Sequence, residues 1–567
     1  MRILGIEGTA WAASAAVFET DRDHVFIESD AYQPDSGGIH PREAAEHMGE
    51  AIPEVIATAL DHARELADEA GESRDDPAID AVAFSRGPGL GPCLRIVGTA
   101  ARTLAGRLGV PLVGVNHMVA HLEIGRHQSG FDSPVCLNAS GANAHLLGYH
   151  GGRYRVLGET MDTGVGNAID KFTRHVGWSH PGGPKVEAAA EDGEYTDLPY
   201  VVKGMDFSFS GIMSAAKQAV DDGEPVENVC AGLQETIFAM LTEVAERALS
   251  LTGTDELVLG GGVGQNARLR EMLSEMCEAR GAAFYAPDPR FLRDNAGMIA
   301  VTGAKMLAAG DTIAIEASAI DPNFRPDQVP VTWRSGEESV ARGLHDRSAA
   351  DTGGEASADA ADLRGAEATV EFVDETVVKR RLPKTYRHPE LDERLRRERT
   401  VAEARLTSEA RRQGVPTPLV RDVDRQKATI TFSAVGDRDL ARGLSPARVR
   451  QVGSHLGRLH AAELVHGDPT TRNARVTGPA GGDTAETGDD ASDPGPDRVY
   501  LIDFGLGFHS GHVEDHAMDL HVFEQSVVGT TDDPEPLLSA VEAGYAETGP
   551  GATLDRLREI EGRGRYQ

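Results

Sequence analysis

Glu463-Leu-Val-His-Gly-Asp-Pro-Thr-Thr-Arg-Asn473 and, further along the chain, Leu501-Ile-Asp-Phe-Gly505 decide how the C-terminal part of this sequence is expected to fold. The apolar run Val499-Tyr-Leu-Ile502 before the second segment is typical of a short buried strand. Asp468 and Asn473 would thus stand in one loop and Asp503 in a second loop after this strand. Each segment alone is common by chance, but their order and the strand between them favour a shared site.

The order Asp468, Asn473, Asp503 is the order of the corresponding residues in the active sites of kinases. In kinase-type phosphoryl transfer one Asp lies beside the nucleophile, an Asn five residues later binds metal, and a second Asp holds the Mg²⁺ that bridges the phosphates of ATP. We therefore predict Asp468 as the catalytic residue and Asn473 and Asp503 as Mg²⁺ ligands.

The net charge of the chain gives information about the salt concentration in which the protein works, and little about its binding partners. The formal net charge is -34, from 90 acidic and 56 basic residues, and only eight of the basic residues are Lys. At about 1 M salt the Debye length falls to about 3 Å, so repulsion among surface carboxylates is screened. The composition is thus typical of a protein that works in concentrated salt, and Arg side chains can still bind nucleic-acid phosphates.

Cysteine spacing and hydropathy predict a cytoplasmic location. The four cysteines, Cys93, Cys136, Cys230 and Cys277, form no Cys-x-x-Cys motif, which fits a reducing compartment. Glu7 and Gly8 interrupt the first apolar run too early for a signal peptide, and no apolar stretch approaches the length needed to cross a membrane.

Composition divides the chain into a first domain at residues 1–334, an acidic linker at 335–364 and a second domain at 365–567. Inside the second domain, residues 477–498 are expected to form an acidic surface loop, and residues 554–567 form a basic tail. The first domain alternates strands and helices, which predicts an α/β fold. The expected strands are Ile3–Ile6, Ala81–Phe84, Val110–Val115, Val135–Asn138 and Glu256–Leu259, and the expected helices are Ala44–Ala70 and Val229–Ser250.

Asn116-His-Met-Val-Ala-His121 places two imidazoles on one face of a helix, at metal-binding spacing. Two histidines without a metal are the alternative. A zinc protease would need Glu after the first His as its general base, and Met118 stands there instead. Glycine-rich turns after several strands, such as Ser140-Gly-Ala-Asn143, suggest backbone amides arranged around a nucleotide.

These motifs belong to an ordered set that resembles the tRNA threonylcarbamoyltransferase family and spans nearly all of residues 1 to 325. The set comprises Gly5-Ile-Glu-Gly-Thr-Ala10, Asn116-His-Met-Val-Ala-His-Leu-Glu123, Asp170-Lys-Phe-Thr-Arg174, Pro181-Gly-Gly-Pro184, Asp206-Phe-Ser-Phe-Ser-Gly211, Leu233-Gln-Glu-Thr-Ile-Phe238, Gly261-Gly-Val-Gly-Gln-Asn266 and Asp294-Asn-Ala-Gly-Met-Ile-Ala300.

The resemblance implies a duplicated actin/Hsp70/sugar-kinase fold (ASKHA) with nucleotide and metal between its halves. It implies transfer of threonylcarbamoyl from threonylcarbamoyl-AMP to N6 of the adenosine beside the anticodon, in tRNAs that read ANN codons. Fe²⁺ or Zn²⁺ would be held by His117, His121 and Asp294. The adenylate would be lined by Asn138, Ala139, Ser140, Gly141, Ala142, Asp170, Gly183, Glu187 and Asn266.

One position departs from this family. Archaeal and eukaryotic members usually place Tyr, which can contribute to the metal, where this chain has Asn138. An amide oxygen binds a hard metal more weakly than a phenolate does, so water or substrate are alternative ligands.

The C-terminal segments Lys379-Arg-Arg-Leu-Pro-Lys-Thr-Tyr-Arg-His-Pro-Glu-Leu-Asp-Glu-Arg-Leu395 and Arg399-Thr-Val-Ala-Glu-Ala-Arg405 resemble the small atypical kinase of the KEOPS complex, an α+β protein-kinase-like fold. Lys379 is predicted to bind the phosphates of ATP and to pair with Glu403, with Glu398 as the alternative partner. The predicted ATP-binding residues are Gly365, Ala366, Glu367, Ala368, Val373, Lys379 and Glu403. Pro469 and Arg472 depart from the usual Leu and Ser of this kinase.

The sequence therefore predicts a fusion of a tRNA threonylcarbamoyltransferase with its partner kinase or ATPase. The expected partners are tRNA, threonylcarbamoyl-AMP and other KEOPS subunits, and no membrane. The alternatives are a regulatory Ser/Thr kinase with a nucleotide-sensing N-terminal module, and a metalloprotease, against which Met118 speaks.

Overall fold

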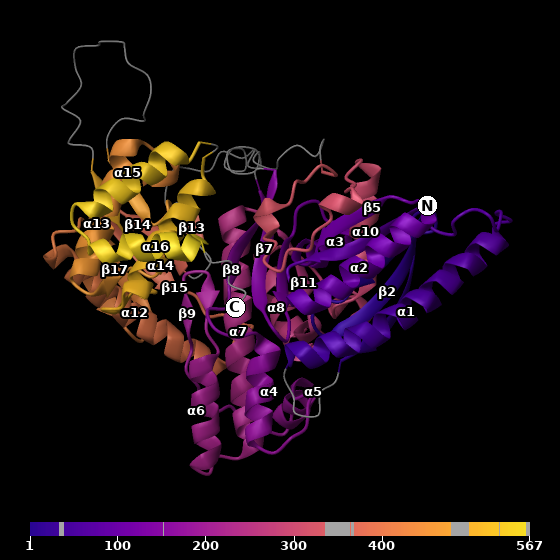
Figure 1. Cartoon of the computed structure of the whole chain (residues 1–567). Helices are drawn as coiled ribbons and strands as arrows, with labels where there is room; N and C mark the ends of the chain where they lie inside the picture. Colours follow the sequence, from indigo (N-terminus) through magenta and orange to yellow (C-terminus); the bar gives the residue numbers. More distant parts are fainter. Residues whose placement is uncertain are drawn as a thin grey trace, which may run out of the picture. The chain divides into compact units, whose positions relative to one another are not determined.

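The computed structural model describes residues 1–32, 39–150, 152–334, 363–364, 368–477, 498–531 and 533–562. These residues divide into two compact units, 1–334 and 363–562 (Figure 1). Most of the expected linker and acidic loop, and the last residues of the basic tail, lie outside the described residues. In the described ranges, no helix is both long and apolar enough to cross a bilayer.

The first unit contains two five-stranded sheets of identical topology. One has the order β3-β2-β1-β4-β5 and the other β12-β11-β6-β7-β8. In each, three strands form an antiparallel meander and two later strands add in parallel to its first strand. The repetition confirms the expected duplicated α/β fold. The strands are β1 Arg2–Glu7, β2 Ala12–Glu19, β3 His24–Ala31, β4 Ala81–Gly87, β5 Leu112–Asn116, β6 Val135–Ala139, β7 Ala144–His150, β8 Arg153–Glu159, β11 Glu256–Gly260 and β12 Ala283–Tyr285.

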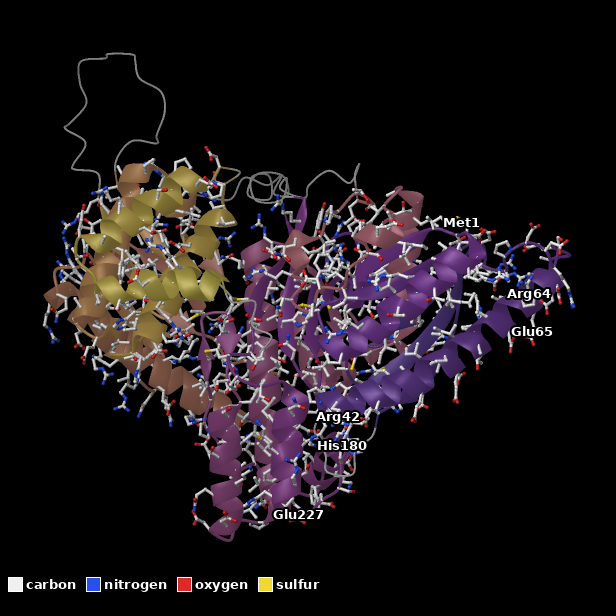
Figure 2. The ribbon with its side chains drawn as sticks, viewed as in Figure 1. Met1, Arg42, Arg64, Glu65, His180 and Glu227 are labelled. Carbon is white, nitrogen blue, oxygen red and sulfur yellow. The ribbon has the colours of Figure 1, made fainter. Side chains whose placement is uncertain are left out.

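Helices cover these sheets because each presents an apolar stripe to them. In α1, buried residues such as Met48, Ile52 and Val55 recur at helical spacing, while Arg42 and Glu65 face solvent (Figure 2). The helices of the unit are α1 Pro41–Glu69, α2 Gly91–Leu108, α3 His117–Ser129, α4 Val165–His175, α5 Gly183–Ala190, α6 Ser210–Asp221, α7 Val226–Thr252, α8 Ala267–Arg280, α9 Pro289–Leu292 and α10 Ala296–Ala308. Short strands β9 Val202–Lys203 and β10 Asp206–Phe207 form a separate ribbon.

Helices α3 and α10 lie at the junction of the two sheets. Helix α10 packs on β1, β2 and β4, and α3 contacts β5, β6, β11 and α10. Both approaches need glycine, because a Cβ on Gly5 would collide with the carbonyl oxygen of Ala296, and a Cβ on Gly125 would collide with Val258. Side chains on α3 can therefore contact elements of both halves.

The second unit is an antiparallel sheet beside a helical part. The sheet has the order β13-β14-β15-β17-β16, and the long helix α12 packs on β16 and β17. Its elements are β13 Leu363–Arg364, β14 Ala368–Val373, β15 Thr376–Arg381, α12 Pro389–Arg412, β16 Val420–Asp424 and β17 Thr429–Ser433.

The helical part of the second unit has its own core. Residues that include Leu456, Phe504 and Phe523 are buried there together. The expected strand at 499–502 is confirmed as β21. The elements are β18 Arg438–Asp439, α13 Pro446–Ala461, β19 Leu464–Val465, β20 Ala474–Val476, β21 Val499–Leu501, β22 Phe508–His509, α14 Val513–Val528, α15 Glu535–Ala546 and α16 Gly551–Gly562.

Candidate functional site

Two histidines of α3 and an aspartate from a distant part of the chain meet at the start of that helix. The rings of His117 and His121 lie edge to face with centroids 4.8 Å apart. Asp294, which precedes α10, places Oδ1 3.4 Å from Nε2 of His117 and 3.3 Å from Nε2 of His121. Among the described residues this is the one group of three potential metal ligands, with ligand atoms within 4.8 Å of one another.

A second carboxylate, that of Glu7 at the end of β1, lies beside this cluster and adds a negative charge to it. Its Oε2 lies 3.2 Å from Nδ1 of His117, and the side chain is fully buried. Burial alone would lower the pKa of His117, but Glu7 and Asp294 raise it to about 10. Burial also opposes the charge of Asp294, yet His117 and His121 hold the pKa of its carboxyl well below the usual value. The buried carboxylate of Glu7 and the partly buried one of Asp294 thus favour a cation at these imidazoles.

The donor set fits a metal ion. Two imidazoles and one carboxylate are the ligands that iron and zinc use in proteins. Here all three converge on one place, with ligand atoms within 4.8 Å of one another and the carboxylate of Glu7 beside them. The chemistry of these donors, and not only their spacing, fits a metal centre.

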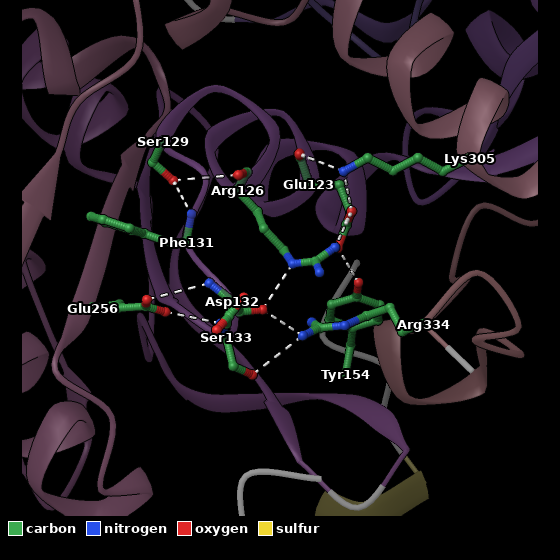
Figure 3. Close-up of polar contacts among 10 residues, drawn as sticks. All are labelled: Glu123, Arg126, Ser129, Phe131, Asp132, Ser133, Tyr154, Glu256, Lys305 and Arg334. Atoms are coloured by element: carbon green, nitrogen blue, oxygen red, sulfur yellow. Dashed lines mark hydrogen bonds and ion pairs between the residues drawn. The ribbon is translucent and has the colours of Figure 1, made fainter. Parts of the chain in front are cut away.

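Helix α3 is held by a buried charge network around Glu123 (Figure 3). The carboxylate of Glu123 is fully buried and accepts a hydrogen bond of 2.7 Å from Nζ of Lys305 on α10. Tyr154 of β8 donates its hydroxyl to the same carboxylate, and Arg126 lies 3.4 Å away. The network joins the helix that carries both histidines to the helix that follows Asp294.

The N-terminus of α3 is fixed as well. Asn116 accepts a hydrogen bond from the backbone of Val119 and donates its own amide to the carbonyl of Phe324, 2.8 Å away. The cap orders the first turn, on which His117 stands, because it satisfies amides that have no partner in the helix.

The predicted adenylate residues Asn138, Ala139, Ser140, Gly141 and Ala142 lie at the end of β6 and in the turn to β7. The turn contacts the start of α4, where the backbone amide of Asn167 donates to the carbonyl of Gly141 over 2.9 Å. Asn138 is 4% exposed, and its Oδ1 has no hydrogen-bond partner.

Hydrogen bonds connect the remaining predicted adenylate residues across three helices. Asp170 of α4 accepts the amide of Gly182, 2.8 Å away, just before Gly183 opens α5. Glu187 of α5 accepts the amide of Ala267, 2.8 Å away, and Asn266 caps α8. The structure thus brings these residues to neighbouring helix starts, where backbone amides favour anions.

In the second unit, Lys379 stands between two carboxylates. Its Nζ lies 2.8 Å from Glu403 and 2.7 Å from Asp503. Glu403 is the predicted partner, whereas Glu398 instead approaches Arg394. Burial would lower the pKa of Lys379, but Asp503 and Glu403 raise it, so this lysine stays charged. Asp503 itself has a positive φ of 64°, a backbone state that is uncommon for residues other than glycine.

Hydrogen bonds from the loop itself and from α14 hold the predicted catalytic loop in place. The side-chain amide of Asn473 donates to Oδ2 of Asp468 over 2.9 Å, so the two residues face each other. Asp519 of α14 accepts the backbone amides of His466 and Gly467 at 2.9 Å and 2.8 Å. This carboxylate is fully embedded and fixes the start of the loop.

The other predicted ATP-binding residues are spread more widely. Gly365, Ala366 and Glu367 lie outside the described residues. Ala368 is buried at the start of β14, and Val373 is 42% exposed at its end. Lys379 pairs with Val370, so Val373 stands about 10 Å further along the strand and not beside the lysine.

Three residues that contact the predicted site residues were not predicted from the sequence. They are Glu7, Arg381, which approaches Glu403 to 2.6 Å, and Asp519. Glu7 follows a buried strand, and this position is a signal that could have singled it out. Arg381 and Asp519 owe their roles to contacts far apart in sequence, so no local pattern marks them.

Comparison with known proteins adds two findings. Residues 22–301 match the family described as TsaD, tRNA N6-adenosine threonylcarbamoyltransferase. The whole chain is similar to proteins named probable bifunctional tRNA threonylcarbamoyladenosine biosynthesis protein. The one from Haloarcula marismortui is 69% identical over 100% of both chains. The one from Methanospirillum hungatei is 50% identical over 100% of this chain and 99% of its own length.

Proposed function

Because the chain belongs to the family of bifunctional tRNA threonylcarbamoyladenosine biosynthesis proteins, we propose that its two units divide the work of one tRNA modification. The first unit is a TsaD-type transferase with the actin-like ASKHA fold of that family. It transfers threonylcarbamoyl from threonylcarbamoyl-AMP to N6 of the adenosine beside the anticodon. Family membership favours this reading over a nucleotide-sensing module or a protease.

The convergence of His117, His121 and Asp294 is the observation that carries the transferase site. These residues would hold iron or zinc. A metal bound there would supply Lewis-acid polarisation of the carbonyl that the adenine amine attacks.

The chain's own residues prepare this site. Glu7 accepts the Nδ1 proton of His117, which leaves Nε2 directed at Asp294 and the cation position. The amide of Gly183 at the start of α5, with the turn at Ser140–Ala142, would bind the phosphate of the adenylate. The first amides of α8 already donate to Glu187 and Asn266. Gly183 leaves open space at this place, because a Cβ there would meet no atom within 4 Å.

The second unit is a kinase-like ATPase that supports the transfer. Lys379 would hold the phosphates of ATP, while Asn473 and Asp503 would bind Mg²⁺. Asp468 would orient the attacking water or hydroxyl as its base. The pairing of Lys379 with Glu403 and Asp503 supports this assignment, since one cation links the sheet to the metal-binding loop. KEOPS subunits and tRNA are the proposed partners.

The decisive assay supplies the full chain with tRNA, threonine, bicarbonate, ATP and an adenylate-making enzyme, and measures threonylcarbamoyladenosine by mass spectrometry of digested tRNA. The modified nucleoside should form. Its absence, with metal bound and the adenylate present, would contradict the transferase assignment.

Two variants test whether the units are separate. Asp468→Asn should abolish ATP hydrolysis while metal stays bound. His117→Ala combined with His121→Ala should release the metal and leave ATP hydrolysis intact. Loss of both functions in either variant would rule out two independent sites.

A further inference from the structure

His145 of β7 is a buried histidine without a hydrogen-bond partner. It is 2% exposed, and neither Nδ1 nor Nε2 contacts a polar atom. A buried polar group without a partner is unfavourable because it has lost its hydrogen bonds to water, so a ligand that pairs with it would be stabilising.

The strand register places this imidazole toward the metal centre proposed above. His145 pairs directly with Asn138 across β6 and β7, so both side chains leave the sheet on the same face. Helix α3, with His117 and His121, packs on β6. The next pair on the same face, Cys136 with Leu147, shares a buried cluster with Val119 and Leu122 of α3, so His145 faces this helix. Burial, together with the charges of His121 and His117, lowers the pKa of His145 to about 3.

Further buried polar atoms on β6 and α3 also lack hydrogen-bond partners. Oδ1 of Asn138 and Nδ1 of His121 are buried without partners, as are both nitrogens of His145. Asn138 is short, and its amide oxygen is a weak donor to iron or zinc, whereas a neutral imidazole is a strong one. His145, which lies opposite Asn138, can thus supply the strong nitrogen ligand that Asn138 lacks.

We propose that His145 is a further protein ligand of the metal held by His117, His121 and Asp294. This inference rests on the proposed metal centre and adds a third imidazole to it. His145 lies outside the group whose ligand atoms are within 4.8 Å of one another, so the proposal requires its side chain to turn toward Asp294 when metal binds. Three imidazoles and one carboxylate select a transition metal and discriminate against Mg²⁺ and Ca²⁺.

X-ray absorption of the full chain loaded with Zn²⁺ tests the ligand directly. Multiple scattering from imidazole rings should count three histidines in the unaltered protein and two in His145→Gln. A count of two in the unaltered protein would overturn the role of His145 while leaving the metal centre in place. Failure of the unaltered protein to bind Zn²⁺ would instead contradict the proposed centre itself.

Affinity provides a second measurement. Competition with a chelator should show that His145→Gln weakens Zn²⁺ binding by about 100-fold or more, since changes even beyond the ligands cost 10–100-fold. His62→Gln is the matched control, because His62 on α1 also has a buried ring nitrogen without a partner. Equal affinity of His145→Gln and His62→Gln would refute the proposal. Tryptophan fluorescence verifies that both variants fold, and the histidine count of the unaltered protein needs no variant.

Discussion

Replacing Glu123 by Gln removes the charge that clamps α3 to α10, and its cost can be worked from the structure. The carboxylate is fully buried, with Lys305 at 2.7 Å and Tyr154 as a second donor. Breaking a buried ion pair costs about 3–5 kcal/mol when the partner stays buried. Lys305 is 23% exposed and can turn to water, and Gln retains an acceptor for Tyr154. The free energy of unfolding should therefore fall by about 2–3 kcal/mol.

Tryptophan fluorescence during urea unfolding in molar KCl measures this loss for the first unit alone. All three tryptophans, Trp11, Trp178 and Trp333, lie in that unit, so the second unit contributes no tryptophan signal. Glu65→Gln is the control, because the side chain of Glu65 is 77% exposed and such surface changes usually stay within about 0.5 kcal/mol. If Glu123→Gln costs no more than Glu65→Gln, the clamp does not stabilise the unit.

A double-mutant cycle separates the ion pair from other effects of the substitution. Lys305→Met removes the cation but retains an apolar stem of similar length. Combined with Glu123→Gln, it should cost less than the sum of the two single changes, because the second substitution no longer breaks a pair. Additive losses would show that Glu123 and Lys305 do not interact energetically.

Three further predictions concern the second unit. Asp519→Asn should lower the rate of ATP hydrolysis by about 10-fold or more without changing ATP affinity, because it loosens the loop amides of His466 and Gly467; single-turnover rates and nucleotide titration test this. Lys379→Met should weaken ATP binding in the same titration, whereas unchanged binding would remove this lysine from the phosphate site. Burial lowers the pKa of His455 to about 4, against about 6.5 when unfolded, so the unfolded state gains a proton first as pH falls. The free energy of unfolding should thus drop by up to about 3 kcal/mol between pH 6.5 and 4. Hydrogen exchange in the second unit measures this drop. His455→Asn should make the free energy of unfolding depend less on pH.

Local elements were largely predictable from sequence. Short apolar runs predicted the strands that became β1, β4, β6 and β11, because a continuous apolar run reflects burial of a strand on both faces. The four-residue spacing of His117 and His121 predicted a shared face, since helical geometry is local. Kinase-type spacing likewise placed Asp468 and Asn473 opposite each other.

Contacts between distant residues were not predictable from these patterns. The ion pair of Glu403 with Arg381 depends on how α12 packs on its sheet. Asp519 of α14 accepts the backbone amides of His466 and Gly467, which lie 53 and 52 residues earlier in the chain. Residues close in sequence can also lie apart. Val373 is near Lys379 in the sequence, but it lies at the other end of the strand pair, because Lys379 pairs with Val370.

The sequence by itself determined the two kinds of unit, the resemblance to a transferase and a kinase, and the histidine pair, because these depend on residue order and local backbone geometry. The tertiary structure alone decided that Glu7 orients His117, that Glu123 ties α3 to α10, and that His145 stands opposite Asn138. Strand register and close packing set those contacts, and both result from the burial of the whole core and from no single segment of the chain.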